Sequence, residues 1–456
     1  MKSRAEQQVS VTQLSSKPKR LTTVSSYSGL EYSLCWGTMA HVNRLLCWAL
    51  LAGALIWPCP CLGQGNSVTA SARSIHDSAI VIDTHEDTPQ RFLDENYDIG
   101  STDPQDPDFI TLDKARAGNL SAVFFSIWVY SATNEGHFAK RTLELIDSVY
   151  GQASKHSDRM MMCFSVADIE RAHQEHKFAV LMGIEGGHSI ENNLSLLRDF
   201  YRLGVRYMTL TWNNTNEWAD SSGDIESSAI AHHNGLTAFG KQVVLEMNRL
   251  GMMVDVSHVS DKTFWDVLST TKVPVIASHS SARALVDVPR NMDDDMLRAV
   301  AKNGGVVNVA FPSAFVDKRF NEEAFAQHQR MLAAAEEHNS KRVAAGLPVS
   351  LEDTQRFDLE WLDGNKIPRA PLNSLIDQID HVVRVVGVDH VGLASDSNGR
   401  EFLPADIDSA ADFPRITQAL LKRGYCPDDI KKILGGNMLR VFLEVATASH
   451  DMPTPP

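Results

Sequence analysis

The sequence lacks the features that mark several classes of protein. It contains no run of basic residues long enough to follow a phosphate backbone, and 57 Asp and Glu residues outnumber 43 Lys and Arg residues. Nucleic acid is therefore not an expected partner. With 27 Gly and 18 Pro in 456 residues, the composition is neither collagen-like nor low-complexity. What remains is an ordinary globular chain, long enough for one large domain or two medium ones.

The sequence also lacks a comfortable membrane span. Such a span needs roughly 20 apolar residues, but the apolar run Leu45–Trp57 has only 13. Arg44 precedes this run and small residues follow it, a pattern typical of a secretory signal peptide. We therefore predict a signal peptide over residues 39–63, an over-extended or disordered segment over residues 1–38, and export to the periplasm or the medium. An uncleaved anchor that keeps the protein at the membrane is the alternative.

Few cysteines remain after this cleavage. Four of the six lie before residue 64, which leaves Cys163 and Cys426. Two thiols cannot form a disulfide framework, so the fold must depend on its hydrophobic core or on metal. The mature chain keeps 37 basic and 55 acidic residues, a net charge of −18. Residues 446–456 form a polar tail with no apolar segment for a lipid anchor.

From residue 75 onward, short apolar runs alternate with segments of helical periodicity. The predicted strands cover residues 79–83, 121–129, 179–184, 205–210, 252–256, 273–277, 305–310 and 390–394. The predicted helices between them include residues 194–203, 236–250, 261–268, 292–302 and 372–386. Apolar runs without alternation are typical of parallel strands buried on both faces. Eight such strands predict an α/β fold, a (β/α)8 TIM barrel over residues 75–445, with an open doubly wound sheet as the alternative.

One segment interrupts this alternation of predicted strands and helices. Residues 315–369 are long, charged and helical in places, and then rich in Pro and Asp. We predict a helical insertion after the seventh strand that covers a face of the barrel, where it either shapes a site or packs on the outside.

Polar residues gather where the predicted strands end. His85 and Asp87 follow the first strand and Glu185 the third. Three further segments contribute His258, His279 and Asp396 after the fifth, sixth and eighth strands. Because the carboxyl ends of barrel strands meet at one mouth, these side chains are expected to lie together there.

These residue types are metal ligands. His85 and Asp87 are two apart on an extended segment, so they point the same way and can bind one cation together. Glu185 offers two oxygens, enough to bridge two ions, and His258 and His279 can complete a second ligand set. Mixed nitrogen and oxygen ligands suit Zn²⁺, and two such ions would bind a shared hydroxide and polarise a substrate oxygen. The alternative is that each residue is a satisfied polar group of the core.

Two further residues have candidate roles at this mouth. Asp396 closes the last strand and could pass a proton from the attacking water to the leaving nitrogen. A metal ligand or a helix cap is its alternative role. Arg290 follows His279 by eleven residues and could hold a substrate carboxylate through two hydrogen bonds. Its alternative is a salt bridge with the acidic run 293–295.

The chain resembles a bacterial-type member of the membrane (renal) dipeptidase family, zinc metallopeptidases of the amidohydrolase superfamily. The similarity covers roughly residues 75–445 without the insertion. The matching motifs are Asp83–Asp87 (DTHED), Gly183–Ser189 (GIEGGHS), Gly204–Thr211 (GVRYMTLT), Trp218–Asp220 (WAD), Asn248–Gly251 (NRLG), Asp255–Ser260 (DVSHVS), Ser278–Ala282 (SHSSA), Arg290–Asn291 and Gly435–Phe442 (GGNMLRVF).

The resemblance implies a barrel with a binuclear zinc site that hydrolyses dipeptides, often with a D-residue on the C-terminal side. By position it implies two zinc ions. The first would be held by His85 and Asp87, the second by His258 and His279, and Glu185 would bridge them. It further implies that Asp396 transfers protons, that Arg290 binds the dipeptide's carboxylate, and that a hydroxide bridging the metals attacks the scissile carbonyl. A homodimer is also in keeping with the family.

The chain departs from the family at two important positions. Where vertebrate members have a His that helps to stabilise the tetrahedral intermediate, this sequence has Trp212, followed by Asn213. An indole N–H can donate a hydrogen bond but cannot carry a proton or a charge. Either residue could contact substrate in place of the His. Asn398, where the family's last strand ends in Asp-x-Asp, is a second departure. The alternatives are therefore an amidohydrolase of another amide, such as an N-acyl amino acid or a cyclic amide, or a non-catalytic binding protein.

Overall fold

The computed structural model describes residues 68–103, 106–345, 347, 357, 360–362, 364–397 and 402–449. The predicted signal peptide, the segment before it, Asn398 and the end of the polar tail lie outside these residues. Within the described part of the chain, no helix combines the length and the apolar character that crossing a membrane requires. Cys163 and Cys426 are both free thiols.

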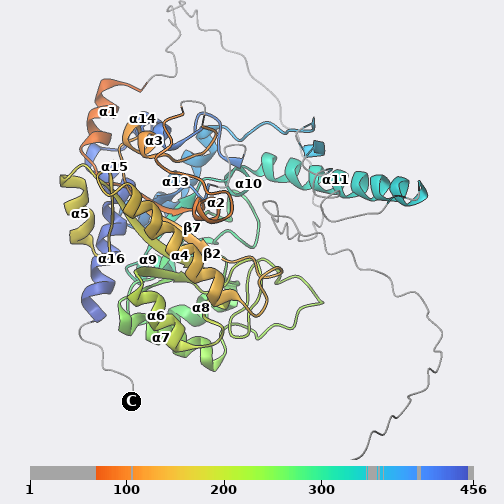
Figure 1. Ribbon diagram of the computed structural model, residues 1–456. Coiled ribbons are helices and arrows are strands. Elements are labelled where there is room, and N and C mark those ends of the chain that lie inside the picture. Colours follow the sequence, from red (N-terminus) through yellow and green to blue (C-terminus); the bar gives the residue numbers. More distant parts are fainter. Residues whose placement is uncertain are drawn as a thin grey trace, which may run out of the picture.

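A single parallel sheet occupies the centre of the molecule, surrounded by helices (Figure 1). Eight of its strands follow one another in the order β1-β2-β4-β5-β6-β7-β8-β9, and β3 pairs with β4 beside this path. The strands are β1 (Val81–Glu86), β2 (Leu120–Trp128), β3 (Met160–Met162), β4 (Phe178–Glu185), β5 (Val205–Thr209), β6 (Met253–Asp255), β7 (Ile276–Ser280), β8 (Val306–Ala310) and β9 (Val391–Ala394).

The first and last strands of this path come together. The backbone N–H of Asp396 donates to the carbonyl oxygen of His85 at 2.9 Å. Beside it, the N–H of Ser395 donates to the carboxylate of Asp83 at 2.8 Å. These bonds bring the end of β9 against β1 and nearly close the barrel. The predicted (β/α)8 barrel is confirmed, and the open doubly wound sheet is excluded.

The helices alternate with the strands. Those described are α1 (Ala70–Asp77), α2 (Pro89–Asp94), α3 (Leu112–Ala117), α4 (Phe138–Lys155), α5 (Val166–Gln174), α6 (Leu194–Arg202), α7 (Ala238–Leu250), α8 (Asp261–Thr270), α9 (Asp294–Lys302), α10 (Ser313–Val316), α11 (Lys318–Ala344), α13 (Leu372–Val386), α14 (Phe413–Lys422), α15 (Pro427–Lys431) and α16 (Asn437–Ala448). Helices α6 to α9 and α13 confirm the five predicted ones. Asn193, Thr237, Ser260 and Asp293 begin the first four of these, because each side chain accepts a hydrogen bond from the first turn.

The interior of the barrel is apolar at one end and polar at the other. Phe124 and Tyr207 belong to the interior cluster, which α16 completes with Phe442. The rings of Phe124 and Phe442 lie 6.2 Å apart, edge to face. Since Phe124 lies in the middle of β2, α16 fills the interior below the carboxyl ends of the strands. Those ends are left for polar side chains.

Two strands differ from the prediction by more than one residue at an end. The sixth predicted strand begins at Ile276 rather than Val273, because Pro274 has no N–H to give to a sheet. The first strand continues through Glu86. His85 and His279 therefore lie within strands and not after them, and the sheet itself holds their backbones. Strand β3, only three residues long, was not predicted from the sequence.

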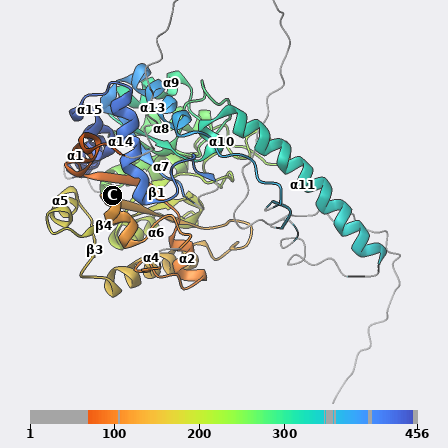
Figure 2. The same ribbon diagram turned by 90° about the horizontal axis from the view of Figure 1, so that it is seen from above.

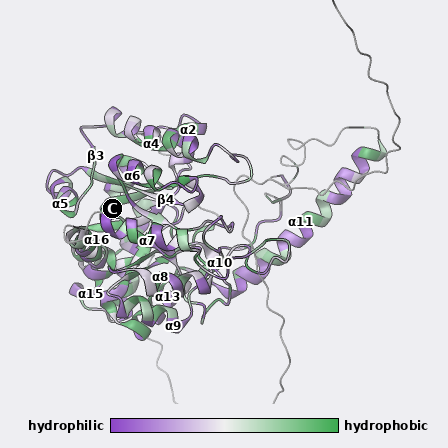
Figure 3. Cartoon of the chain, turned by 90° about the horizontal axis from the view of Figure 1, so that it is seen from below, coloured by the Kyte–Doolittle hydropathy of each residue, from purple (hydrophilic) through white to green (hydrophobic). Residues whose placement is uncertain are grey.

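The insertion after the seventh barrel strand, β8, is present, but α11 does not cover a face of the barrel as predicted. It extends away from the barrel (Figure 2) and is coloured mostly as hydrophilic (Figure 3). Its first turn packs inward, where Phe320 is buried and Asn321 donates to the carbonyl of Ala314. Farther along the helix, only Met331 and Ala335 are buried. A helix with so few apolar residues has little to bury against the barrel. Ion pairs one turn apart, such as Arg319 with Glu323, stabilise it instead.

Candidate active site

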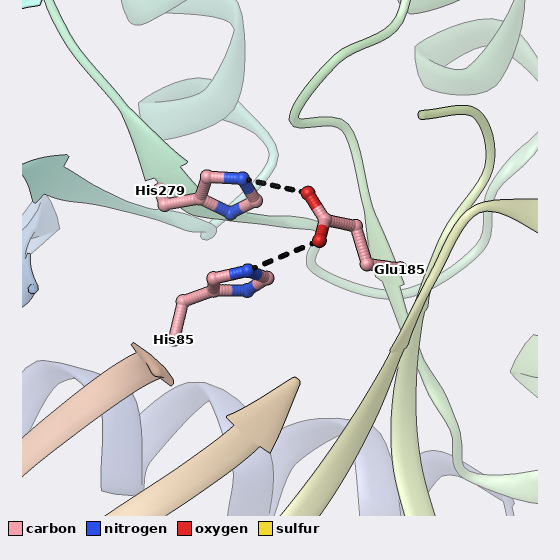
Figure 4. A group of neighbouring side chains, drawn as sticks. All are labelled: His85, Glu185 and His279. Atoms are coloured by element: carbon pink, nitrogen blue, oxygen red, sulfur yellow. Dashed lines mark ion pairs between the residues drawn. The ribbon is translucent and has the colours of Figure 1, made fainter. Parts of the chain in front are cut away.

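Imidazole and carboxylate groups from separate strands converge on Glu185, the last residue of β4. Its Oε1 lies 2.8 Å from Nε2 of His258 and 3.3 Å from Nε2 of His279, and its Oε2 lies 3.4 Å from Nε2 of His85. Figure 4 shows His85 and His279 directed at different oxygens of this carboxylate. Their rings are stacked with centroids 3.7 Å apart. All four side chains are buried.

The other ring nitrogen of His85 is held by Tyr207 of β5. The phenol oxygen lies 2.8 Å from Nδ1, and the hydroxyl donates its proton to the carbonyl of Thr84 at 3.1 Å. It can therefore only accept from His85, so Nδ1 carries a proton and, in the neutral ring, Nε2 presents a lone pair to the site. Gly183 makes room for this phenol, because a Cβ there would lie 1.9 Å from the ring of Tyr207.

Hydrogen bonds also fix which ring nitrogen of His279 carries a proton. The hydroxyl of Ser278 donates to the carboxylate of Asp255 at 2.6 Å and lies 2.7 Å from Nδ1 of His279. A carboxylate only accepts, so the serine oxygen accepts from the imidazole. Asp255 is itself held by backbone N–H groups of Ser257 and Ser278. This chain of bonds leaves Nε2 of His279 without a proton.

His258 is oriented from a loop. The side-chain oxygen of Asn213 lies 3.1 Å from Nδ1 of His258 and can only accept, which again leaves Nε2 unprotonated. The backbone of His258 has φ 63°, as Asp396 has φ 45°. For residues with a Cβ this left-handed conformation is unfavourable, and it persists where the surroundings impose it. Both strained residues lie at the mouth.

Two more carboxylates border His85. Asp87 Oδ1 lies 3.7 Å from His85 Nε2, and the ligand atoms of His85, Asp87 and Asp396 all lie within 4.8 Å of one another. A second group of the same kind contains His85, Glu185 and His279. The structure thus brings together all five predicted metal ligands and Asp396. It also leaves the alternative role of Asp396, that of a ligand, geometrically open.

The electrostatics of the group favour a cation. Burial lowers the pKa of His85, but the carboxylates of Glu185, Asp87 and Asp396 outweigh it and raise the pKa to about 10. Burial likewise raises the pKa of Asp87 well above its usual range. For Glu185, burial is opposed by His85 and by hydrogen bonds from His258 and His279, and its pKa stays well below the usual range. The carboxylates therefore favour a positive charge beside Glu185, either a proton on His85 or a metal ion in its place.

The donor set fits divalent metal ions. Nε2 of His258 and Nε2 of His279 face each other at 3.0 Å, and hydrogen bonds elsewhere on both rings leave each with a lone pair. Lone pairs this close repel unless a positive charge lies between or beside them. Nε2 of His85 and Oδ1 of Asp87 are buried with no hydrogen-bond partner. Unpartnered imidazole nitrogens beside carboxylates are ligands that zinc and similar metals prefer.

Arg290 lies at the rim beside His279. It donates to the carbonyl of His279 at 2.7 Å and to the hydroxyl of Ser280 at 3.0 Å, and its guanidinium lies over the ring of Phe315. Its Nε is buried without a partner. Burial lowers the pKa of Arg290, while the negative charge of Asp396 opposes this shift. None of the described contacts joins Arg290 to the acidic run 293–295, which was its alternative partner.

Comparison with known proteins identifies the family. The model of the membrane dipeptidase family (peptidase family M19) matches residues 69–456. This match spans most of the chain. The chain belongs to the membrane dipeptidase family. Human dipeptidase 3 is 31% identical over 378 residues, which are 82% of this chain and 67% of that protein. The chain is thus a member of a metallopeptidase family, and the enzyme class predicted from the sequence is confirmed.

Solved structures of similar proteins agree with this fold. The probable dipeptidase PvdM from Pseudomonas aeruginosa superposes on this chain with a TM-score of 0.68 and 26% identity, over 83% of this chain and 98% of that one. A metallo peptidase from Rhodobacter sphaeroides, liganded with a phosphinate mimic of the dipeptide L-Ala-D-Ala, has a TM-score of 0.64 and 21% identity, over 81% and 100%. The second likeness shows the fold alone.

Sequence reasoning missed the residues that orient His85 and His279. Tyr207, Ser278 and Asp255 all stand inside motifs that resemble the family, but none was assigned a role. The available signal was period-2 alternation. Tyr207 and Asp255 lie on interior-facing strand positions, where a polar residue must find a partner.

Proposed function

We infer that the chain hydrolyses the peptide bond of dipeptides with two zinc ions, and that its substrates include dipeptides with a C-terminal D-residue. The observation that carries this inference is the convergence of the Nε2 atoms of three imidazoles on Glu185, beside Asp87 and Asp396 and with one arginine at the rim. Membership of the membrane dipeptidase family supports the substrate class.

The assignment of ligands follows the geometry. His85 and Asp87 would hold one ion, His258 and His279 the other, and the two oxygens of Glu185 would contact both. When bound, the ions would polarise the scissile carbonyl and lower the pKa of the attacking water. Asp396, whose carboxylate lies within 4.8 Å of the ligand atoms of His85 and Asp87, would take a proton from the attacking water and return it to the leaving nitrogen. Arg290 would hold the substrate carboxylate through the donors that face the mouth.

Two predicted substrate-binding residues take different parts. Trp212 lies beside Gly186, directly after Glu185, where it can contact a substrate bound at the carboxylate. Asn213 contacts Nδ1 of His258. We assign Asn213 a positioning role through that imidazole and keep Trp212 as a residue that contacts substrate.

The function is tested with the purified zinc-loaded protein on L-Ala-L-Ala and L-Ala-D-Ala, beside N-acetyl-L-Ala-L-Ala and tri-alanine. We expect turnover of the free dipeptides only. Arg290→Gln should raise KM for the dipeptides, while Arg298→Gln, which removes an exposed guanidinium that pairs with Asp295 on α9, should not. Turnover of the N-acetylated substrate in place of the dipeptides would favour the related amidohydrolase. Zinc binding without any turnover would favour a binding protein.

Export and a homodimer complete the proposal. The signal-peptide pattern before residue 64 supports export. Cell fractionation of the full-length chain, with mass determination of the mature N-terminus, tests cleavage against retention as a membrane anchor. Sedimentation of the purified protein tests the dimer that the family resemblance implies.

A further inference from the structure

Three aromatic rings line one side of the mouth, and the proposed reaction gives them no shared role. Trp128 ends β2, Tyr130 follows two residues later, and Trp212 follows β5. Trp128 and Trp212 are stacked with centroids 5.4 Å apart, and Tyr130 meets Trp212 edge to face at 5.6 Å. We call these three residues the aromatic wall. Each of them is partly exposed.

The aromatic wall lies directly beside the metal-binding group. In the parallel register of β2 and β4, Trp128 is the partner of Glu185. Ser126, two residues earlier on the same face of β2, donates to Oε2 of Glu185 at 3.2 Å. Trp128 therefore points toward the barrel interior, on the side of the carboxylate. On the other flank, a Cβ at Gly186 would lie 3.3 Å from Cβ of Trp212.

Arg290 stands on the opposite side of the mouth. Its partners His279 and Ser280 end β7, the sixth strand along the barrel, whereas Trp128 ends the second. Four of the eight strand positions, half the circumference, separate Trp128 from Arg290, and two positions separate Trp212 from it. The imidazoles and Glu185 lie between the arginine and the aromatic wall.

A bound dipeptide has a fixed order of groups across this mouth. Its carboxylate would contact Arg290 and its scissile carbonyl would lie at Glu185 and the imidazoles. The first residue then extends beyond the carbonyl, toward the aromatic wall. Its ammonium is drawn to the carboxylates of Asp87 and Glu185, which leaves its side chain to face the three rings. Aromatic faces bind apolar and aromatic side chains through buried area and offset or edge-to-face contact.

We propose that the aromatic wall selects dipeptides whose first, N-terminal residue has a large apolar or aromatic side chain. This inference rests on the dipeptidase function proposed above and deepens it. A side chain of this size in an apolar subsite changes kcat/KM by about 10–200-fold per group gained or lost. The rings of Trp128 and Trp212 offer no charge to a Glu or Lys side chain in that place.

The test compares two matched substrate series with the full-length, zinc-loaded enzyme. In the series X-Ala, X is Gly, Ala, Leu, Phe, Glu or Lys, and in the series Ala-X the same residues stand second. We expect kcat/KM to rise at least tenfold from Gly-Ala to Phe-Ala and Leu-Ala, with a smaller rise in the second series. Absence of turnover on every dipeptide would contradict the proposed function itself. Turnover without this preference, or with the preference in the second series, would overturn the proposed role of the aromatic wall but not the dipeptidase function.

Substitutions in the aromatic wall test whether its rings cause this substrate preference. Trp212→Ala should reduce the ratio of Phe-Ala to Gly-Ala by about tenfold and leave the Ala-X ratios unchanged. Trp265→Ala, which removes an exposed indole on α8, is the matched control and should change neither series. Because Trp212→Ala could fail to fold, Tyr130→Glu tests the same surface by adding a negative charge. This variant should raise kcat/KM for Lys-Ala relative to kcat/KM for Phe-Ala. If the variants preserve the wild-type ratios, the aromatic wall does not face the first residue.

Discussion

The phenol of Tyr207 lies 2.8 Å from Nδ1 of His85, although 122 residues separate them in sequence. The tyrosine donates to the carbonyl of Thr84, so it accepts the proton of the imidazole and fixes which nitrogen faces the carboxylates. Such partners of metal-binding histidines set both ring orientation and ligand basicity. Loss of the Tyr207 hydroxyl should therefore change the affinity of the site for metal.

Tyr207→Phe should weaken metal binding while the fold is retained, because the ring still fills the interior and only the hydroxyl is lost. We expect a loss of about 10–100-fold in affinity for the more weakly held ion, measured by competition with a chromogenic chelator. Tyr425→Phe removes a tyrosine hydroxyl bonded to Asp380 on the outside of the barrel and should leave affinity unchanged. Equal affinity in both variants would remove Tyr207 from the metal site.

Glu185→Gln should lose metal and activity together. The carboxylate is the group toward which all three histidines point, and a neutral amide neither balances the charge of two ions nor offers two equivalent oxygens. Elemental analysis after gel filtration should find fewer than two zinc ions per chain. Glu246→Gln changes a glutamate of similar burial that pairs with Arg198 and Arg249, and should keep its metal.

Asp396→Asn should keep metal and lose turnover by about 10²–10⁴-fold, the usual contribution of a group that transfers protons in the transition state. Elemental analysis and kcat are measured on the same sample. Asp199→Asn, on the surface of α6, is the control for the change of charge. If the Asp396 variant loses zinc along with activity, the carboxylate is a ligand together with His85 and Asp87.

The free energy of unfolding should fall as the pH falls from 6.5 toward 4, in part because of His76. Its ring is bonded to Thr417 and to the carbonyl of Gly118, and burial lowers its pKa from 6.5 to about 4, against the effect of that carbonyl. Between these values the unfolded chain binds more protons than the folded chain. Stability from this group is therefore present above pH 6.5 and is lost as the pH drops through 4.

Urea unfolding at pH 7.5 and pH 5.0 measures this contribution. His76 alone should account for about 2 kcal/mol of the difference in wild type. In His76→Gln the difference should shrink by that amount. His390→Gln removes a half-buried imidazole that also bonds a backbone carbonyl, that of Gly305, and serves as the comparison. An unchanged difference in His76→Gln would mean that this imidazole does not titrate between the two states.

Local sequence patterns determined the barrel and the identity of the groups at its mouth. Apolar runs separated by capped helices are read within a window of a few residues, and His85, Asp87, Glu185 and His258 stand at or just beyond the ends of such runs. The convergence of carboxyl ends in a barrel then predicts that they meet. Only details that depend on a single residue, such as the effect of Pro274 on β7, shifted the boundaries.

The tertiary structure alone decided which residues orient those groups and what borders them. Tyr207 reaches His85, and Trp212 stacks on Trp128, because strand register brings together residues that no local pattern relates. The direction of α11 was likewise undetermined, since a helix polar on most of its surface has no apolar face that would hold it against the barrel. Periodicity indicates which face of an element is buried. The packing of elements distant in sequence determines which side chains then meet.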